Sequence, residues 1–382
     1  MMKIAIAKEL NVNERRVALI PDVVSRLVKQ GLEIYVEAGA GEGSCFSDAL
    51  YEEAGAQVIT DSAKLWGEAN ILLKVSPPQE EEVGKMAEGA VLIGFLNPLG
   101  EPDLIQKLSD RRVTAFSMEM VPRTSRAQSM DALSSQANIA GYKAVLIAAA
   151  NLPKYFPMLT TAAGTIRPAK VLVLGAGVAG LQAIATARRL GAIVEAFDIR
   201  PEVKEQVQSL GAKFVDVTLD EDTVAEGGYA KEISEQAKQH TQEVLTQHVA
   251  ASDVVITTAQ VPGKKAPVLV NANMVAQMKP GSVIVDLAAE QGGNCEGSEP
   301  GKNIQKNGVT IMGPINIPGS MPVHASEVYA KNLSALLQLM VTKEGELDLN
   351  FADDILDGAC VTHGGEIRSQ RVKEALGVPV GQ

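Results

Sequence analysis

Residues 170–180 read KVLVLGAGVAG, and they decide the fold of the second half of the chain. The run KVLVL predicts a buried strand, and GAGVAG has the spacing GxGxxG. A helical pattern follows at 181–191, and a second strand-like run, AIVEAFD, ends at Asp198. A strand, a glycine-rich turn, a helix and a second strand in this order are typical of a dinucleotide-binding βαβ unit.

The three glycines of this turn have different expected roles. Gly175 permits a tight turn, Gly177 lets the backbone approach a pyrophosphate, and Gly180 lets the helix pack close to the strand. The pyrophosphate would lie beside Val178, where unpaired N–H groups and the helix dipole attract negative charge. The alternative is a βα turn that binds no ligand.

Asp198 indicates which dinucleotide the turn would bind. A carboxylate there can accept both hydroxyls of the adenosine ribose and would repel a 2′-phosphate, which favours NAD(H) over NADP(H). Ile199 and Arg200 follow, and we expect Arg200 to flank the adenine. Gln260 follows the strand-like run 253–259 and is a candidate near the nicotinamide. A polar strand end exposed to water explains Gln260 equally well.

The composition excludes several classes of protein. A chain of 382 residues predicts two or three domains, and its net charge of −11 disfavours binding to nucleic acid or to lipid headgroups. Cys45, Cys295 and Cys360 are isolated, which argues against a disulfide framework or a metal site and favours a reducing compartment. We find no signal-peptide pattern and no apolar run near the roughly 18 residues of a membrane span, so we expect no direct membrane insertion.

The chain as a whole alternates strand-like and helix-like segments. The strand-like runs lie at 3–10, 32–40, 71–77, 90–98, 113–120, 170–175, 192–198, 213–217, 253–259, 282–288 and 309–314. Such alternation predicts parallel strands with crossover helices, an α/β fold.

We expect two Rossmann-like domains with doubly wound parallel sheets, joined by two long helices and with a cleft between them. The first domain would be discontinuous and contain residues 1–135 plus 330–382, because the tail after the second long helix resembles a return to it. The NAD(H)-binding Rossmann domain would contain residues 136–329.

The segment at the junction, VPRTSRAQSMDALSSQ (121–136), differs from an ordinary linker. Its spacing predicts that Arg123, Gln128, Asp131 and Ser134 lie along one helix-like face. The alternative is that these residues cap and solvate the start of a helix.

A second loop-like segment, DVTLDEDTVAEGGYAKE (216–232), is acidic and contains Gly228 and Tyr229. Loops of this length inside a compact domain are usually lids or disordered. We expect a lid.

The chain offers few groups for proton transfer. A dehydrogenase that oxidises an alcohol or an amine needs a group that takes a proton, usually His, Lys or a carboxylate. We expect His240 and His248 on an exposed helix and His363 in a polar turn. His324 is the one plausibly near the predicted cleft, and we interpret all four histidines as structural or surface residues.

Residues 13–56, with ILLKVSPP and the GAGVAG unit, resemble the family shared by alanine dehydrogenases and the NAD(H)-binding component of proton-translocating transhydrogenases. The resemblance covers nearly the whole chain. Within the family, alanine dehydrogenases have a catalytic histidine where this sequence has Asn97, and they hold the substrate carboxylate with residues that match Arg16 and Lys74. Because an amide does not titrate near neutral pH, Asn97 disfavours the alternative, an alanine dehydrogenase-like amino-acid dehydrogenase.

Residues 122–138 resemble the transhydrogenase loop, which implies that Arg123, Gln128, Asp131, Leu133 and Ser134 bind the nucleotide. Segment 216–232 resembles the mobile loop of the same proteins, with Tyr229 as its tyrosine. Tail residues 353–367 are also transhydrogenase-like. The resemblance is to the version whose alpha subunit is split in two, with the membrane helices on a separate polypeptide.

The resemblance implies direct hydride transfer between NAD(H) here and NADP(H) on a partner, with proton translocation by membrane subunits. Such a transfer moves no proton to or from the reacting carbons, so catalysis would rest on proximity and orientation. Arg123 would donate to the carboxamide, Asp131 and Ser134 would fix Arg123 or the amide, and Gln128 would reach the second nucleotide.

The implied partners are the NADP(H)-binding domain of the beta subunit, a separate membrane segment of the alpha subunit and a second copy of the chain. The implied location is the cytoplasm, peripheral to the inner face of the membrane. A non-catalytic NAD(H)-sensing module is the alternative from another class.

Overall fold

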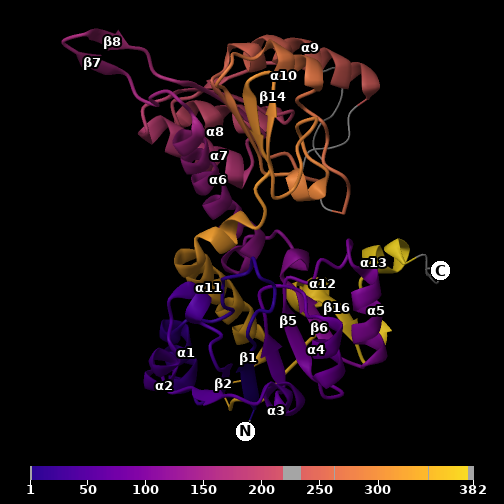
Figure 1. Ribbon diagram of the computed structural model, residues 1–382. Helices are drawn as coiled ribbons and strands as arrows, with labels where there is room; N and C mark the ends of the chain where they lie inside the picture. Colours follow the sequence, from indigo (N-terminus) through magenta and orange to yellow (C-terminus); the bar gives the residue numbers. More distant parts are fainter. Residues whose placement is uncertain (1, 218–233, 262, 343, 377–382) are drawn as a thin grey trace. The chain divides into compact units, whose positions relative to one another are not determined.

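The computed structural model describes residues 2–217, 234–261, 263–342 and 344–376. The chain forms two compact units, Met1–Gln136 with Pro318–Gln382, and Ala137–Ile317. Each unit contains a mostly parallel sheet covered by helices (Figure 1). The predicted α/β fold with two Rossmann-like domains is confirmed.

The sheet of the first unit has the order β17-β16-β6-β5-β4-β1-β2-β3. Its core strands are parallel, and the two strands from the end of the chain are antiparallel additions at one edge. The strands are β1 (Lys3–Ile6), β2 (Glu33–Glu37), β3 (Gln57–Ile59), β4 (Ile71–Leu73), β5 (Val91–Gly94), β6 (Thr114–Ser117), β16 (Cys360–His363) and β17 (Glu366–Ile367).

Helices cover both faces of this sheet. They are α1 (Pro21–Lys29), α2 (Asp48–Glu53), α3 (Ser62–Glu68), α4 (Glu80–Lys85), α5 (Pro102–Asp110), α11 (Pro322–Met340), α12 (Asp354–Ala359) and α13 (Gln370–Ala375), with 3-10 turns η1 (Glu42–Ser44), η2 (Met118–Met120) and η3 (Gln128–Met130). A parallel sheet needs this cover because its strands carry apolar side chains on both faces, and the helices keep these side chains from water.

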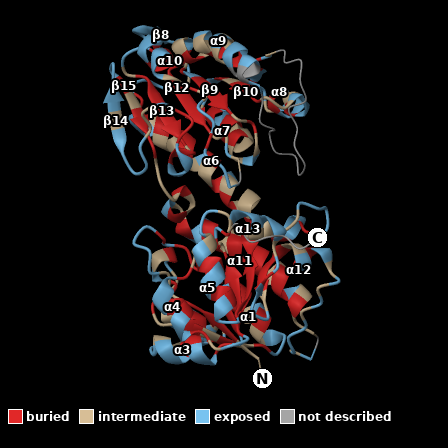
Figure 2. Cartoon of the chain, turned by 90° about the vertical axis from the view of Figure 1, so that its right-hand side faces the viewer, coloured by how far each residue is buried: buried red, intermediate tan, exposed pale blue. Residues whose placement is uncertain are grey.

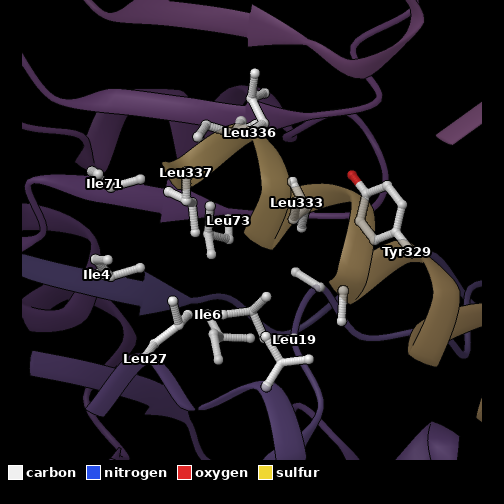
Figure 3. Packing of buried hydrophobic residues seen from close by; sticks show 14 of the residues in the cluster. Ile4, Ile6, Leu19, Leu27, Ile71, Leu73, Tyr329, Leu333, Leu336 and Leu337 are labelled. Carbon is white, nitrogen blue, oxygen red and sulfur yellow. The ribbon is translucent and has the colours of Figure 1, made fainter. Parts of the chain in front are cut away.

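Alternation along each strand builds two separate cores in the first unit. Ile4 and Ile6 of β1 pack in the core that contains α1 and α11, whereas Ala5 between them belongs to the core under α3, α4 and α5. The alternation follows from the two-residue period of a strand. In Figure 3, Leu333, Leu336 and other side chains of α11 point toward the strand residues Ile4, Ile6, Ile71 and Leu73.

The second unit has the sheet order β11-β10-β9-β12-β13-β15-β14, parallel except for the edge strand β14. Its strands are β9 (Lys170–Leu174), β10 (Ile193–Phe197), β11 (Lys213–Phe214), β12 (Val254–Thr257), β13 (Val283–Asp286), β14 (Asn303–Lys306) and β15 (Val309–Met312). A separate hairpin is formed by β7 (Leu159–Thr161) and β8 (Gly164–Ile166).

Both faces of the second sheet are also covered, and its central strands β9, β12, β13 and β15 are mostly buried, whereas the edge strand β14 is largely exposed (Figure 2). The helices and 3-10 turns are α7 (Val178–Arg189), η4 (Pro201–Val203), α8 (Lys204–Ser209), α9 (Glu235–Ala251), α10 (Ala272–Gln277) and η6 (Ala289–Gln291). Val171 and Val173 pack with α6 (Ala132–Asn151) and α7, whereas Leu172 and Leu174 pack with α9 and α10.

The chain changes unit within two elements. Helix α6 begins at Ala132, and its first residues belong to the first unit. The turn η7 (Ile317–Ser320) precedes α11, all of which lies in the first unit. The chain therefore returns to the first unit at Pro318, while the domain limits given above, 135/136 and 329/330, stay predictions.

Two helical glycines differ in the space around them. A Cβ atom at Gly141 of α6 would lie 2.0 Å from the carbonyl oxygen of Ala179 of α7, whereas at Gly84 of α4 it would meet no atom within 4 Å. Gly141→Ala must push two helices apart, and we expect it to destabilise the protein by about 1–3 kcal/mol. Gly84→Ala should stabilise it by about 0.5–1 kcal/mol, because alanine loses less backbone entropy on folding. Urea unfolding of both variants measures the difference, and equal effects would contradict this packing.

Candidate nucleotide and loop site

The turn after β9 requires two of its glycines for its own packing. Gly175 has a φ of 98°, and a Cβ atom there would lie 2.5 Å from Oγ1 of Thr258. A Cβ atom at Gly180 would lie 1.8 Å from the carbonyl oxygen of Gly175. These two glycines let the turn, β12 and α7 approach closely.

Gly177 differs, because the described residues leave open the space beside it. The nearest heavy atom to a Cβ built there is Nη2 of Arg200, at 3.9 Å. Gly177 is also the N-cap of α7, and it offers no side chain to the first N–H groups of that helix. Val178, the first helical residue, is exposed. Free space beside free N–H groups at a helix N-terminus fits a pyrophosphate group.

Asp198 is buried and joins the turn to Arg200. Its Oδ2 accepts hydrogen bonds from the backbone N of Ala176 at 2.7 Å and from Nη2 of Arg200 at 2.9 Å. Its Oδ1 accepts from the backbone N of Arg200 at 2.9 Å and from Nε at 3.0 Å. The ion pair raises the pKa of Arg200. Ile199 lies between the two residues in the chain.

These bonds constrain how Asp198 could hold a ribose. A carboxylate has about four acceptor positions, and the four bonds above fill them. Two ribose hydroxyls would therefore replace the two bonds from the Arg200 side chain. A movement of Arg200 away from Asp198 would agree with the expected place of Arg200 beside the adenine, and both roles stay predictions.

The carboxyl end of β12 is organised by a residue that sequence reasoning missed. Asn294 is completely buried, and its Nδ2 donates to the carbonyl oxygens of Ala259 and Pro267, each at 2.8 Å. Its Oδ1 accepts from the backbone N of Ala259 at 3.0 Å. Gln260 next to this clamp is exposed, and its Nε2 donates to the carbonyl oxygen of Leu287 at 3.0 Å. A single asparagine after a glycine pair offered no pattern that predicts this clamp.

In the first unit, the predicted helix-like face of segment 121–136 is wrong. Residues 121–127 form a loop, η3 makes one short turn, and α6 begins only at Ala132. Asp131 accepts hydrogen bonds from the backbone N of Ser134 at 2.8 Å and from its Oγ at 2.6 Å. This geometry is that of an N-cap, so the alternative of a helix cap holds for this pair. Leu133 between them is half-buried.

Arg123 and Gln128 are exposed on a loop that is firmly held. Ala127 and Met130 are buried in the core that contains α11. Nδ2 of Asn332, on α11, donates to the carbonyl oxygen of Ser129 at 2.7 Å. The loop therefore carries the exposed residues Arg123 and Gln128 on a fixed backbone.

Arg16 and Lys74, the basic residues shared with the resembling alanine dehydrogenases, are paired with carboxylates of this chain. Nε and Nη2 of Arg16 donate to the two oxygens of Glu14 at 2.8 and 2.6 Å. Nζ of Lys74 lies 3.0 Å from Glu82 and 3.5 Å from Glu9. Burial raises the pKa of Glu9.

Asn97 lies in the same unit and adopts a left-handed backbone with a φ of 48°. Its backbone N donates to Glu119 at 2.9 Å. Burial raises the pKa of Glu119, which accepts hydrogen bonds from Ser117 and from the backbone N of Leu96 as well. Glu119 thus fixes the loop, and the Asn97 side chain offers an amide in place of a titratable ring.

The histidines have structural or surface settings. His240 and His324 are exposed, and His248 lies 2.7 Å from Glu195. The prediction of a polar turn for His363 is wrong, because it ends β16, where its Nδ1 lies 3.0 Å from Oγ1 of Thr114. Gly228 and Tyr229 of the predicted lid lie outside the described residues.

Comparison with known proteins identifies the family. Family models described as the N-terminal and C-terminal domains of alanine dehydrogenase/PNT match residues 5–140 and 144–370. The chain belongs to the alanine dehydrogenase/PNT family.

Within the alanine dehydrogenase/PNT family, the chain is 48% identical to the first part of NAD(P) transhydrogenase subunit alpha of Rhodospirillum rubrum, over 96% of this chain and 97% of that protein. It is 32% identical to alanine dehydrogenase of Bacillus subtilis, over 98% and 95%. The crystal structure of transhydrogenase from Sinorhizobium meliloti matches with a TM-score of 0.87 and 46% identity, over 96% and 99%. The higher identity lies on the transhydrogenase side, as the sequence resemblance predicted.

In the part of the chain that the structure describes, no helix has both the length and the apolar character that a membrane span requires.

Gly177 and Gly180 allow a test that separates binding from folding. The methyl group of Gly177→Ala would clash with no described residue, so we expect a normally stable protein. Its affinity for NADH should fall at least about tenfold, because the methyl group would occupy the space for the pyrophosphate. Gly180→Ala should destabilise the protein by about 1–3 kcal/mol. Calorimetric titration with NADH and thermal unfolding measure the two effects. Unchanged NADH affinity of folded Gly177→Ala would contradict the proposed phosphate site.

Proposed function

We propose that this chain is the NAD(H)-binding component of a proton-translocating NAD(P) transhydrogenase. It would bind NAD(H) and pass a hydride directly to or from NADP(H) held by a partner domain. The observation that supports this function best is the loop at 121–131, which presents Arg123 and Gln128 from a backbone held by Asn332. The transhydrogenase relatives named above agree with it.

The proposed reaction requires the protein mainly to orient the two nicotinamide rings. The dihydronicotinamide ring supplies a hydride, and no proton has to leave the reacting carbons, so the chain needs no residue to take one. Holding two rings at contact distance can lower the activation barrier, by on the order of 7–11 kcal/mol in well-oriented systems. A rigid loop contributes to such catalysis, whereas a flexible one would not.

Each residue of the proposed site would have a limited task. The N–H groups at Gly177 and Val178 would bind the pyrophosphate, and Asp198 would accept the ribose hydroxyls while Arg200 moves to the adenine. Arg123 would donate to the carboxamide oxygen of the nicotinamide. Gln128 would reach the second nucleotide. Asp131 and Ser134 bond to each other and keep the start of α6 in place, so their contribution would be to loop geometry.

The partners follow from the same proposal. The NADP(H) would be bound by a domain of the beta subunit, and protons would pass through membrane subunits, including a separate segment of the alpha subunit. The chain would act as a homodimer at the cytoplasmic face of the membrane. The name of the Rhodospirillum rubrum relative describes one part of a divided alpha subunit, which supports this division here.

Amino-acid dehydrogenation is the second candidate, favoured by Arg16, Lys74 and the identity to alanine dehydrogenase. Asn97 argues against it, because an amide cannot take the proton of an ammonium group or a carbinolamine.

The activity can be measured with the purified chain, a soluble NADP(H)-binding transhydrogenase domain, NADPH and acetylpyridine-NAD⁺. We expect reduction of acetylpyridine-NAD⁺ only when both proteins are present. No transfer despite NADH binding would argue against the proposal, and pyruvate with ammonium would then test the second candidate.

Gln128→Asn tests the role of the loop amide. Because the shorter side chain would no longer reach the second nucleotide, we expect hydride transfer to fall at least about tenfold, with NADH affinity changed less than about threefold. Gln106→Asn, an exposed glutamine of α5, is the matched control and should have no effect. Unchanged transfer by Gln128→Asn, with NADH binding also unchanged, would contradict the assigned role.

A further inference from the structure

Arg126 lies between Arg123 and Gln128 on the loop, and its guanidinium forms a forked contact with two carboxylates. Its Nη1 donates to Oδ2 of Asp353 at 2.6 Å, and its Nη2 donates to Oδ1 of the same residue at 2.7 Å. Nη2 also contacts a carboxylate oxygen of Asp354. Asp353 and Asp354 are 227 and 228 positions away from Arg126 in the chain.

The carboxylate that receives Arg126 is itself fixed. Asp353 is the N-cap of α12, and its Oδ1 accepts from the backbone N of Ile355 at 2.9 Å and of Leu356 at 3.4 Å. Ile355 and Leu356 are buried in the core of the first unit. Arg126 holds the pKa of Asp353 at about 2, so the carboxylate is charged at every pH at which the protein would be assayed.

A second contact places the same stretch against α12. A Cβ atom at Gly358 of α12 would lie 3.3 Å from Cδ of Pro122, the residue just before Arg123. The absence of a side chain at position 358 lets Pro122 lie close to α12. On the other side of Arg126, Ala127 is buried. The exposed stretch is therefore held by packing at both ends and by the Arg126 fork between them.

A planar guanidinium bonded at two atoms fixes direction as well as distance, which a single ammonium cannot do. Arg123 is three residues before this fork and Gln128 two residues after it. The backbone positions of both groups therefore depend on where Arg126 is docked.

We propose that Arg126 is a positioning residue for hydride transfer, which fixes the loop that presents Arg123 and Gln128 by docking on Asp353 and Asp354 at the N-terminus of α12. This inference rests on the function proposed above. Arg126 acts through the loop and has no assigned contact with either nucleotide. Through Arg126, Asp353 and Asp354 near the end of the chain would determine the geometry of the loop at 123–128.

The pair is partly exposed, with 49% of the Arg126 side chain accessible, and exposed ion pairs add little to stability. Loss of Arg126 should therefore alter the loop and leave global stability nearly unchanged. The matched control is Arg112, whose exposed pair with Glu88 at 3.1 Å lies elsewhere in the first unit.

The test compares Arg126→Gln, Arg126→Lys and Arg112→Gln in the full chain by amide hydrogen exchange and by the transfer assay with the NADP(H)-binding domain. For Arg126→Gln we expect exchange of residues 123–128 about tenfold faster, hydride transfer about tenfold slower, and an NADH dissociation constant changed less than about threefold. Arg126→Lys should recover part of both losses, and Arg112→Gln should change neither.

Unchanged exchange and transfer in Arg126→Gln would overturn the proposal. So would faster exchange with unchanged transfer, because the loop would then be held without positioning the reacting groups. Slower transfer with unchanged exchange would show direct action by Arg126 and would also overturn it. If the unmodified chain transfers no hydride, the proposed function fails, and the exchange measurement still decides whether Arg126 holds the loop.

Discussion

The first unit depends on one helix, α11, which must bury apolar side chains and polar ones in the same core. Leu333, Leu336 and Leu337 pack on the sheet. The buried polar groups of the helix find partners on distant segments. Tyr329 donates to the carbonyl oxygen of Lys74 at 2.8 Å, and Asn332 bonds to Ser129. An unpaired buried polar group costs about 1–3 kcal/mol, so these segments can take few other positions while α11 stays packed. The loop that presents Arg123 and Gln128 is held in part by this constraint.

The second unit uses the same device at the carboxyl end of its sheet. Asn294 holds two backbone segments beside β12, and Asp198 ties the glycine-rich turn to Arg200. In both units a buried amide or carboxylate with several hydrogen bonds organises the backbone, and exposed polar side chains lie nearby. Such an arrangement suits a reaction whose demand is the orientation of two rings. Because the proposed hydride transfer takes no proton from the reacting carbons, it requires no titratable group in place of Asn97.

The sequence predicted the α/β fold because alternating apolar strands and amphipathic helices are local patterns. Among the strands that it missed are β14, β16 and β17, antiparallel strands of two to four residues at or next to a sheet edge, which are too short to carry a clear pattern. The helix-like face for segment 121–136 was wrong for a related reason. Three-residue spacing is compatible with a helix, but Asp131 caps α6, and the chain before this cap is held by α11 and α12 instead of by helical hydrogen bonds.

By itself, the sequence determined the βαβ turn and its glycines, since the strand, the GxGxxG turn and the helix follow one another directly in the chain. It also determined the choice of Asn97 over a titratable side chain, which limits the chemistry. Only the tertiary structure decided what holds the loop, because Asn332 and Asp353 are 203 and 227 positions away from the residues that they bind. Contacts over such distances in the chain leave no periodic pattern in one sequence, and they exist only after the first unit has packed its core.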